Sequence, residues 1–257
     1  MFITSPTELN NIPKRIVSLV PSQKELLAYL GLEKETIGIT KFCVHPKEWF
    51  RIKTRIGGTK NADIEKIISL HPDLILCNKE ENIKEQVEVL ADRFPVYMSD
   101  VCTYESALQM IADVVTLTGR NAETEKLNQM IRGKFEHFQP DKKRIRTAYF
   151  IWKDPYMTAG GDTFISDMIE KAGFENIYKD RKRYPEVIIP ELKQLQPEVI
   201  LLSSEPYPFK EKHITELQSL LPQTKILLVD GEMFSWYGSR MLYAPEYFQK
   251  LQQQIQA

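Results

Sequence analysis

The chain has 257 residues, of which 42% are hydrophobic, enough for one large core or two smaller ones. Its 34 lysine and arginine residues nearly balance 35 aspartate and glutamate residues, and the net charge of −1 gives no global electrostatic case for nucleic acid or an anionic membrane surface as a partner. The apolar runs are far shorter than the roughly 20 residues of a membrane-spanning helix, so we expect no membrane insertion.

The N-terminal residues lack the basic and apolar regions of a signal peptide, and a core-like strand is expected from Arg15 onward. The sequence therefore predicts either a cytoplasmic protein or a chain trimmed of its leader. Strands and helices then alternate, which favours a parallel sheet covered on both faces. Ser22 is expected to cap the first helix, with Glu25 completing a capping box. The expected strands of this half are 15–20, 36–40, 74–77 and 96–98, and the expected helices are 23–30, 65–70 and 82–94.

Residues 104–138 contain no proline and carry apolar residues at helical spacing. A continuous helix would be about 50 Å long and would join two lobes as a stiff hinge. Gly119 could instead divide it into two helices, and the sequence leaves both arrangements open.

The remaining residues again alternate between strands and helices. Gly160 and Gly161 precede a helix and could form either a tight turn with a helix cap or a loop that cradles an anion, although the lysine of a phosphate-binding P-loop is missing. The expected strands are 147–152, 176–178, 199–203 and 225–229, and the expected helices are 164–172, 190–195, 211–220 and 245–255.

A long-period repeat connects the two halves. Residues 64–76, IEKIISLHPDLIL, return as residues 189–201, IPELKQLQPEVIL. Each copy is typical of a short amphipathic helix, a proline-containing turn and an apolar strand, so the repeat predicts two similarly built lobes with a ligand cleft between them. The fold prediction is α/β, with two Rossmann-like lobes of mainly parallel sheet joined by a long interdomain helix. The predicted domains are an N-terminal lobe over 1–102, a linking helix over 103–140 and a C-terminal lobe over 141–257.

In sheets of this kind a ligand lies beyond the carboxyl ends of the strands. Trp49, Trp152 and Trp236 all fall at or after predicted strand ends. Together with Arg55 and Arg240 as charged donors, they suit a large, flat, partly apolar ligand with carboxylate or amide groups. The alternative is that these aromatic residues close the ends of the core.

In the order and spacing of several short motifs, the whole chain resembles the cobalamin and ferric-siderophore binding proteins. These are the class III, helical-backbone metal-receptor solute-binding proteins of ABC importers. The motifs are PKRIVSLVPS at 13–22, ELL at 25–27, RIGG at 55–58, IEKI at 64–67, LHPDLI at 70–75 and AGFEN at 172–176.

The resemblance implies a monomer that holds a cobalt or iron chelate in the cleft, a corrinoid, a ferric siderophore or haem, with no catalysis and no intrinsic cofactor or metal. It also places ligand contacts in the loop after the first strand and at Tyr184. Strand-end positions and resemblance together give the predicted ligand-binding residues: Pro21, Ser22, Trp49, Arg55, Trp152, Tyr156, Tyr184, Phe234, Trp236 and Arg240.

The resemblance further implies docking on an ABC transporter permease through one acidic residue on each lobe. Glu65 fits the first position, whereas the repeat places Pro190 opposite it and shifts the acid to Glu191. The family is periplasmic or surface-anchored, which contrasts with the missing leader.

Two other classes remain open at this point. A tetrapyrrole-handling enzyme such as a metal chelatase also sets two α/β lobes about a cleft, but it needs a histidine and glutamate pair facing the cavity, and the four histidines are scattered. An interaction module could use the same aromatic loops to dock a protein.

Overall fold

A computed structural model describes residues 1–9, 11–140 and 143–256, and the chain divides into two compact units. The first unit contains residues 1–101, 105–131 and 236–240, and the second contains 102–104, 132–235 and 241–257. Each unit has its own sheet and its own hydrophobic core.

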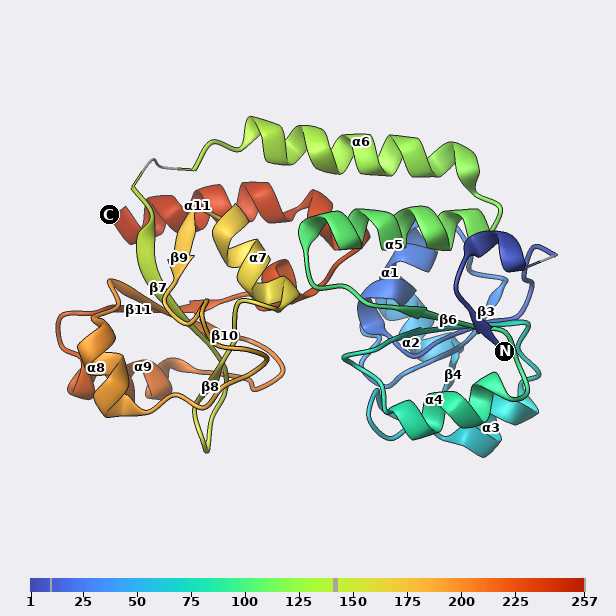
Figure 1. The fold of residues 1–257 in the computed structure, drawn as a ribbon, viewed down its shortest axis with the longest axis horizontal. Helices are drawn as coiled ribbons and strands as arrows, with labels where there is room; N and C mark the ends of the chain where they lie inside the picture. The colour runs from blue at the N-terminus through green and yellow to red at the C-terminus, as the bar shows by residue number, and fades with distance from the viewer. Residues whose placement is uncertain (10, 141–142, 257) are drawn as a thin grey trace. The chain divides into compact units, whose positions relative to one another are not determined.

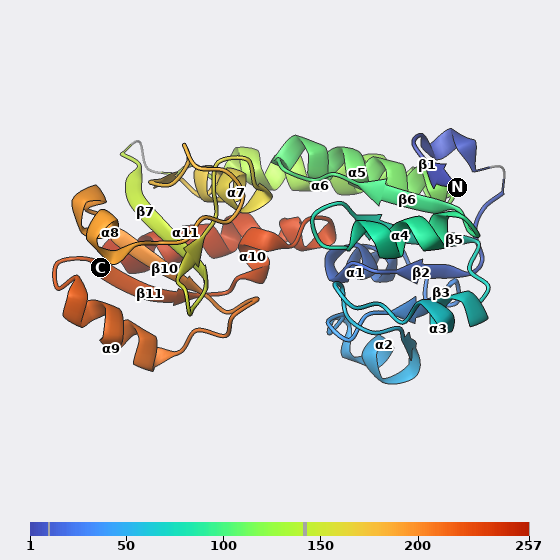
Figure 2. The same ribbon diagram turned by 60° about the horizontal axis from the view of Figure 1, so that its bottom comes forward.

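The first unit is built on a six-stranded sheet in the order β1-β6-β5-β2-β3-β4, and every pairing in it is parallel. Helices α3 and α4 cover one face, and α5 lies on the opposite side (Figures 1 and 2). The strands are β1 (Phe2–Ile3), β2 (Ile16–Ser18), β3 (Thr36–Ile39), β4 (Thr54–Arg55), β5 (Leu74–Asn78) and β6 (Val96–Ser99). The helices that accompany them are the 3-10 helix η1 (Pro6–Glu8), α1 (Pro21–Tyr29), α2 (Lys47–Ile52), α3 (Ile64–Ser69), α4 (Lys84–Ala91), α5 (Tyr104–Leu117) and α6 (Asn121–His137).

The start of α1 differs from the expectation. The helix begins at Pro21, and Val20 is its N-cap residue without a side-chain hydrogen bond, so the predicted capping box of Ser22 and Glu25 is wrong. Proline is favoured at the first helical position because its fixed φ suits the helix and its missing N–H is not needed there. Ser22 therefore lies inside the first turn.

The long helical segment is divided into α5 and α6 at Gly119. Gly119 has φ of +68°, and the backbone N–H groups of Gly119 and Arg120 donate to the carbonyls of Thr116 and Val115. This is the Schellman arrangement that ends a helix and favours glycine. Of the two possibilities left by the sequence, the structure has the two-helix one.

The second unit has the strand order β11-β10-β7-β8, with β9 also paired to β7, and only β8 is antiparallel. One core cluster packs the sheet residues Phe150, Ile200 and Leu202 against Leu192 and Leu217 of two helices. The strands are β7 (Ile145–Trp152), β8 (Met157–Thr158), β9 (Phe174–Asn176), β10 (Val199–Ser203) and β11 (Lys225–Val229). The helices are α7 (Phe164–Lys171), α8 (Ile189–Leu195), α9 (Glu211–Leu220), α10 (Glu232–Ser235), the 3-10 helix η2 (Ser239–Leu242) and α11 (Ala244–Gln256). The strand expected at 176–178 is β9, two residues earlier.

The sequence repeat corresponds to α3 with β5 in the first unit, and the same polar contacts recur in its second copy. The Arg15 guanidinium donates to the carbonyl of Leu70 at the end of α3, with Nε 3.1 Å from the oxygen. Asp73 accepts the backbone N–H of Arg15 at 2.8 Å. His71, in the turn between Leu70 and Asp73, has φ of +45°. The arginine thus ties the end of the repeat helix to the start of β2, where orphan carbonyls need donors.

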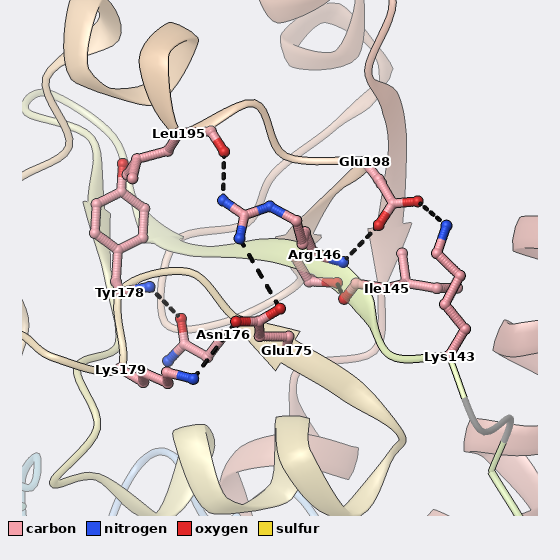
Figure 3. A network of polar contacts seen from close by, with 10 residues as sticks. Lys143, Ile145, Arg146, Glu175, Asn176, Tyr178, Lys179, Leu195 and Glu198 are labelled. Carbon is pink, nitrogen blue, oxygen red and sulfur yellow. Dashed lines mark hydrogen bonds and ion pairs between the residues drawn. The ribbon is translucent and has the colours of Figure 1, made fainter.

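In the second unit the corresponding helix and strand are α8 and β10, and Figure 3 shows the matching contacts. Arg146 Nη2 donates to the Leu195 carbonyl at 2.6 Å, and Glu198 accepts the Arg146 backbone N–H at 3.1 Å. Gln196, at the position of His71, has φ of +48°. The two copies therefore share a helix–turn–strand path and an arginine–carboxylate clamp, which is stronger evidence of repetition than the short sequence match alone.

Candidate functional site

In the first unit, four predicted site residues lie at or near the carboxyl ends of the parallel strands. Pro21 and Ser22 follow β2 and are buried in the first turn of α1, whereas Arg55 ends β4 and is exposed. Arg55 donates from Nη1 to the Phe50 carbonyl at 2.8 Å, and its guanidinium lies 5.2 Å from the centre of the Phe50 ring. Its other guanidinium nitrogens face no acidic partner among the described residues, so Arg55 remains available to a ligand.

The fourth residue, Trp49 of α2, is only 5% exposed. The Nζ atoms of Lys24 and Lys53 lie 5.7 and 5.3 Å from its ring centre, close enough for cation–π attraction. Lys24 is fully buried, its Nζ has no hydrogen-bond partner among the described residues, and burial lowers its pKa. The structure thus places Trp49 between two amines in the packing of the first unit, and its role in ligand binding stays a prediction.

Residues 236–240, named here the strap segment, belong to the first unit although they come late in the chain. Trp236 is 7% exposed and meets His45 edge-on at 5.7 Å between ring centres. Arg240 lies over the Trp236 ring at 5.1 Å and forms a two-point ion pair with Glu25, at 3.0 and 2.5 Å. The charge of Arg240 is therefore already engaged by a carboxylate.

Two further contacts hold the strap segment. The Tyr237 hydroxyl donates to Glu81 at 2.8 Å, and burial, with Glu81 adding to the effect, raises the pKa of this tyrosine well above its usual range. Gly238 has φ of +100°, and a side chain there would lie 3.5 Å from both Leu26 Cβ and the Ser22 carbonyl. The strap segment thus packs closely on α1, which gives Trp236 and Arg240 a structural role.

In the second unit, five aromatic rings gather at the carboxyl ends of β7 and β10. Trp152, which is 41% exposed, meets Tyr207 edge-on at 5.7 Å between ring centres. Tyr207 contacts Phe209 at 4.8 Å, and Phe209 lies parallel to Tyr156 at 6.4 Å. Rings in such offset and edge-on arrangements stabilise one another beyond their buried area. We name Trp152, Tyr156, Tyr207, Phe209 and His213 the aromatic shelf.

A polar network fixes the shelf from one side. Lys153 Nζ lies 2.6 and 2.7 Å from the two carboxylate oxygens of Glu216 and donates to the Tyr156 hydroxyl at 3.2 Å, and that hydroxyl donates to Glu216 at 2.9 Å. Although burial acts to lower it, the pKa of Lys153 is raised by these two partners, and the same lysine holds the pKa of Glu216 below its usual value. The ammonium is therefore a fixed positive charge next to the rings.

His213 is the shelf residue that α9 contributes, and its ring contacts those of Tyr207 and Phe209. It is 2% exposed, its Nδ1 accepts the backbone N–H of Lys210 at 2.9 Å at the start of α9, and its Nε2 lies 3.3 Å from the Tyr207 hydroxyl. An imidazole that accepts at Nδ1 carries its single proton on Nε2 and is therefore neutral. Burial, with the nearby Lys212 and Lys153, lowers the pKa of His213, which agrees with a neutral ring.

This arrangement predicts a loss of stability on acidification. A histidine whose pKa is lowered in the folded state contributes its full stability above the unfolded value of about 6.5 and loses it as the pH falls, because the unfolded chain takes up the proton first. The thermal midpoint should therefore fall between about pH 7.5 and pH 5, less steeply in His213→Asn, whose amide can keep the acceptor but does not titrate. Equal slopes in the two proteins would contradict the assignment.

The other two predicted residues of the second unit have different surroundings. Tyr184 is half-buried. The segment that contains it lies beside β8, because the Thr158 N–H donates to the Pro185 carbonyl and the Val187 N–H donates to the Tyr156 carbonyl. Phe234 is fully buried and packs on Tyr149 and Phe248 at 5.0 and 4.9 Å between ring centres. The aromatic residues of the core cover Phe234, and its role in ligand binding stays a prediction.

Comparisons with known proteins show the family of this chain. A family model described as periplasmic binding protein matches residues 16–222. The chain belongs to this family. The vitamin B12-binding protein of Pectobacterium carotovorum subsp. carotovorum (strain PC1) is 24% identical over 245 residues, which cover 91% of this chain and 87% of that protein. An uncharacterized ABC transporter substrate-binding lipoprotein, YvrC of Bacillus subtilis (strain 168), is 25% identical over 201 residues, 74% of this chain and 63% of that protein.

A solved structure shares the fold of this chain. The periplasmic heme-binding protein RhuT from Roseiflexus sp. RS-1 has a TM-score of 0.78 and 18% identity, over 94% of this chain and 97% of that one. The predicted family resemblance and α/β fold class are thereby confirmed. Because the family consists of binding proteins, the chain is a binding protein and not an enzyme, and the metal chelatase alternative is not supported.

Two acidic residues lie on the repeat helices of the family fold. Glu65 is exposed in the first turn of α3, and Glu191 occupies the first turn of α8, where Arg181 Nη2 lies 2.6 Å from its carboxylate. Acidic residues are stabilised at helix N-termini by the helix dipole, so their presence there does not by itself indicate docking. Their role with a permease stays a prediction.

Sequence reasoning missed Tyr207, Phe209 and His213 as part of the shelf. Tyr207 and Phe209 lie in the loop after β10, which ends at Ser203, so the strand-end rule that selected Trp152 would have selected them too. His213 gave no such signal, because its contacts depend on how α9 turns back beneath that loop. Among the described residues, no group of three or more histidine, cysteine or acidic side chains could hold a metal ion, and no helix is long and apolar enough to span a bilayer.

Proposed function

We propose that this chain holds a metal chelate, a corrinoid, haem or a ferric siderophore, without transforming it, and passes it to an ABC transporter permease. The support is the family match, a relative named for vitamin B12 binding, a structural neighbour named for haem binding and a relative named as an ABC transporter substrate-binding lipoprotein.

The observation that carries the ligand class is the exposed indole of Trp152. Trp152 is 41% exposed, yet its ring meets Tyr207 edge-on, and Tyr207 in turn contacts Phe209. A flat, rigid aromatic surface loses little side-chain entropy when a planar macrocycle stacks on it. The ammonium of Lys153 is already engaged by Glu216 and the Tyr156 hydroxyl, so we propose that it holds Tyr156 in place within the shelf and does not itself bind the ligand.

The remaining predicted residues have two different roles in the proposal. Arg55, Tyr156 and Tyr184 retain exposed or half-buried surface and are proposed as ligand contacts. Pro21, Ser22, Trp49, Trp236 and Arg240 are buried or engaged within the first unit, and we propose that they support the surface that the ligand meets. For delivery, we propose that Glu65 and Glu191 contact basic residues of the permease.

Ligand titration tests the proposal. Cyanocobalamin, haemin and a ferric hydroxamate are each titrated into the protein by isothermal calorimetry, with tryptophan fluorescence as a second readout. We expect saturable one-to-one binding of one of these ligands. Trp152→Ala should weaken it by roughly 1–3 kcal/mol while leaving the thermal midpoint nearly unchanged, because an exposed indole contributes little to the fold.

Tyr243→Ala is the matched control, because Tyr243 is an aromatic residue of similar exposure, 55%, outside the shelf. It should bind with unchanged affinity. An absence of binding for all three ligands, or equal losses in the two variants, would refute the proposed site.

A further inference from the structure

The net charge of −1 hides a strongly basic stretch in the first unit. Residues 41–60 contain six lysine and arginine residues and one acidic residue, Glu48. Lys41, Lys47 and Arg51 are all exposed, and none of them forms an ion pair with an acidic side chain among the described residues. Unpaired cations in one short stretch create a local positive field that the whole-chain charge does not reveal.

Large apolar side chains are exposed in the same stretch. Ile52 at the end of α2 is 64% exposed, and Phe42 is 49% exposed with the Nζ of Lys41 5.1 Å from its ring centre. Single exposed apolar residues are ordinary on protein surfaces. Here two of them lie among unpaired cations. Surfaces that bind lipid headgroups combine basic and apolar side chains in this way.

These residues share one edge of the first unit. Strand β4 is the edge strand of the sheet, and Arg55 at its end stacks on Phe50 of α2. Lys41 donates its backbone N–H to Gly57, two residues beyond Arg55, so the Lys41–Phe42 turn lies at the same edge. Figure 2 shows α2 at the lower margin of the unit, with no other helix or strand beyond it.

The helix itself points its cations outward. Trp49 is buried, and at 100° per residue Lys47 and Arg51 fall on the side of α2 opposite to it. These two cations are four residues apart and repel one another, which has no structural benefit within the unit. An anionic surface would relieve this repulsion.

We propose that this edge, the basic edge patch of Lys41, Phe42, Lys47, Arg51 and Ile52, associates with the surface of a bilayer that contains anionic lipid. The cations contact phosphate headgroups, and Ile52 and Phe42 enter the boundary between headgroups and acyl chains. Nucleic acid offers phosphates but no apolar layer for Ile52, so it fits the patch less well. The proposal does not depend on the ligand of the binding site.

Vesicle co-sedimentation of the full chain tests this. We expect binding to phosphatidylcholine vesicles that contain phosphatidylglycerol, no binding to pure phosphatidylcholine, and loss of binding at high salt, because exposed charges are screened. The double variant Lys47→Glu/Arg51→Glu should lower the partition coefficient by about tenfold or more, since each cation near an anionic surface contributes severalfold. Ile52→Ser should lower it less, without changing the salt dependence.

The matched control is Lys193→Glu/Lys212→Glu, which makes the same charge change at exposed positions of the second unit. It should keep nearly the full partition coefficient, and circular dichroism should show all variants folded. The proposal is overturned if the wild type does not sediment with anionic vesicles, or if the control variant loses as much vesicle binding as the patch variant. It is also overturned if, in a parallel assay with a nucleic acid, the patch variant loses nucleic-acid binding but keeps its vesicle binding.

Discussion

Arg240→Ala should destabilise the protein by about 3 kcal/mol. The side chains of Arg240 and Glu25 are only 12% and 18% exposed, and removing one partner leaves the other charge in a poorly solvated place. The variant also loses the cation–π contact with Trp236. At roughly 2–4 °C per kcal/mol for a protein of this size, the thermal midpoint should fall by about 6–12 °C, measured by calorimetry or circular dichroism.

A double-mutant cycle separates the ion pair from other effects of the substitution. Glu25→Ala/Arg240→Ala should be less destabilised than the sum of the single variants by about 1–3 kcal/mol, because the double variant buries no unpaired charge. If Arg240→Ala instead kept its thermal midpoint and lost only ligand affinity, the residue would belong to the binding surface as the sequence suggested.

The repeat was the part of the fold that could be predicted best from sequence. Its periodicity identified the helix and strand of each copy, which the structure shows as α3 with β5 and α8 with β10. The clamps of Arg15 and Arg146 could not be inferred, because each arginine lies about fifty residues before the helix that it caps. The short strands β1, β4 and β8 were missed because two residues carry no periodic signal and form strands only through their partners.

At the candidate site, too, contacts between residues distant in the chain could not be inferred from sequence, as the tryptophans show. Trp49, Trp152 and Trp236 looked alike in the sequence, since each lies at or after the end of an expected strand. Burial separates them: Trp152 is exposed, whereas the other two are covered by Lys24 and His45, residues distant in the chain. Position after a strand locates a surface, but only tertiary contacts decide which rings remain open to a ligand.

For Gly160 and Gly161, before α7, the sequence left open a tight turn with a helix cap or an anion-binding loop, and backbone contacts decide between them. The N–H groups of Gly160 and Gly161 donate to the carbonyls of Arg183 and Arg181 at 2.7 and 2.9 Å, and Thr163 caps α7 by accepting the N–H of Ser166. These N–H groups are therefore already satisfied by backbone carbonyls. The structure supports the tight turn with a helix cap over the anion-binding loop.

Gly161→Ala should accordingly be among the most damaging single substitutions, with a loss of more than about 3 kcal/mol. An added Cβ would lie 2.0 Å from the Lys179 carbonyl oxygen and 2.9 Å from its carbon, and both are backbone atoms that cannot rotate away. The backbone would have to separate, breaking the Gly161–Arg181 hydrogen bond. Denaturant unfolding should show a lower midpoint, and inorganic phosphate should restore none of the lost stability.

Gly133→Ala is the matched control, because it is the same substitution inside α6 with no atom within 4 Å of the added Cβ. Alanine is favoured over glycine in a helix by about 1 kcal/mol, so this variant should be more stable than the wild type. Opposite signs for the two substitutions would show that close backbone approach, and not glycine content, makes Gly161 necessary. A loss at Gly161 no larger than that of an ordinary surface substitution would mean that residues 179–183 do not pack against this turn in solution.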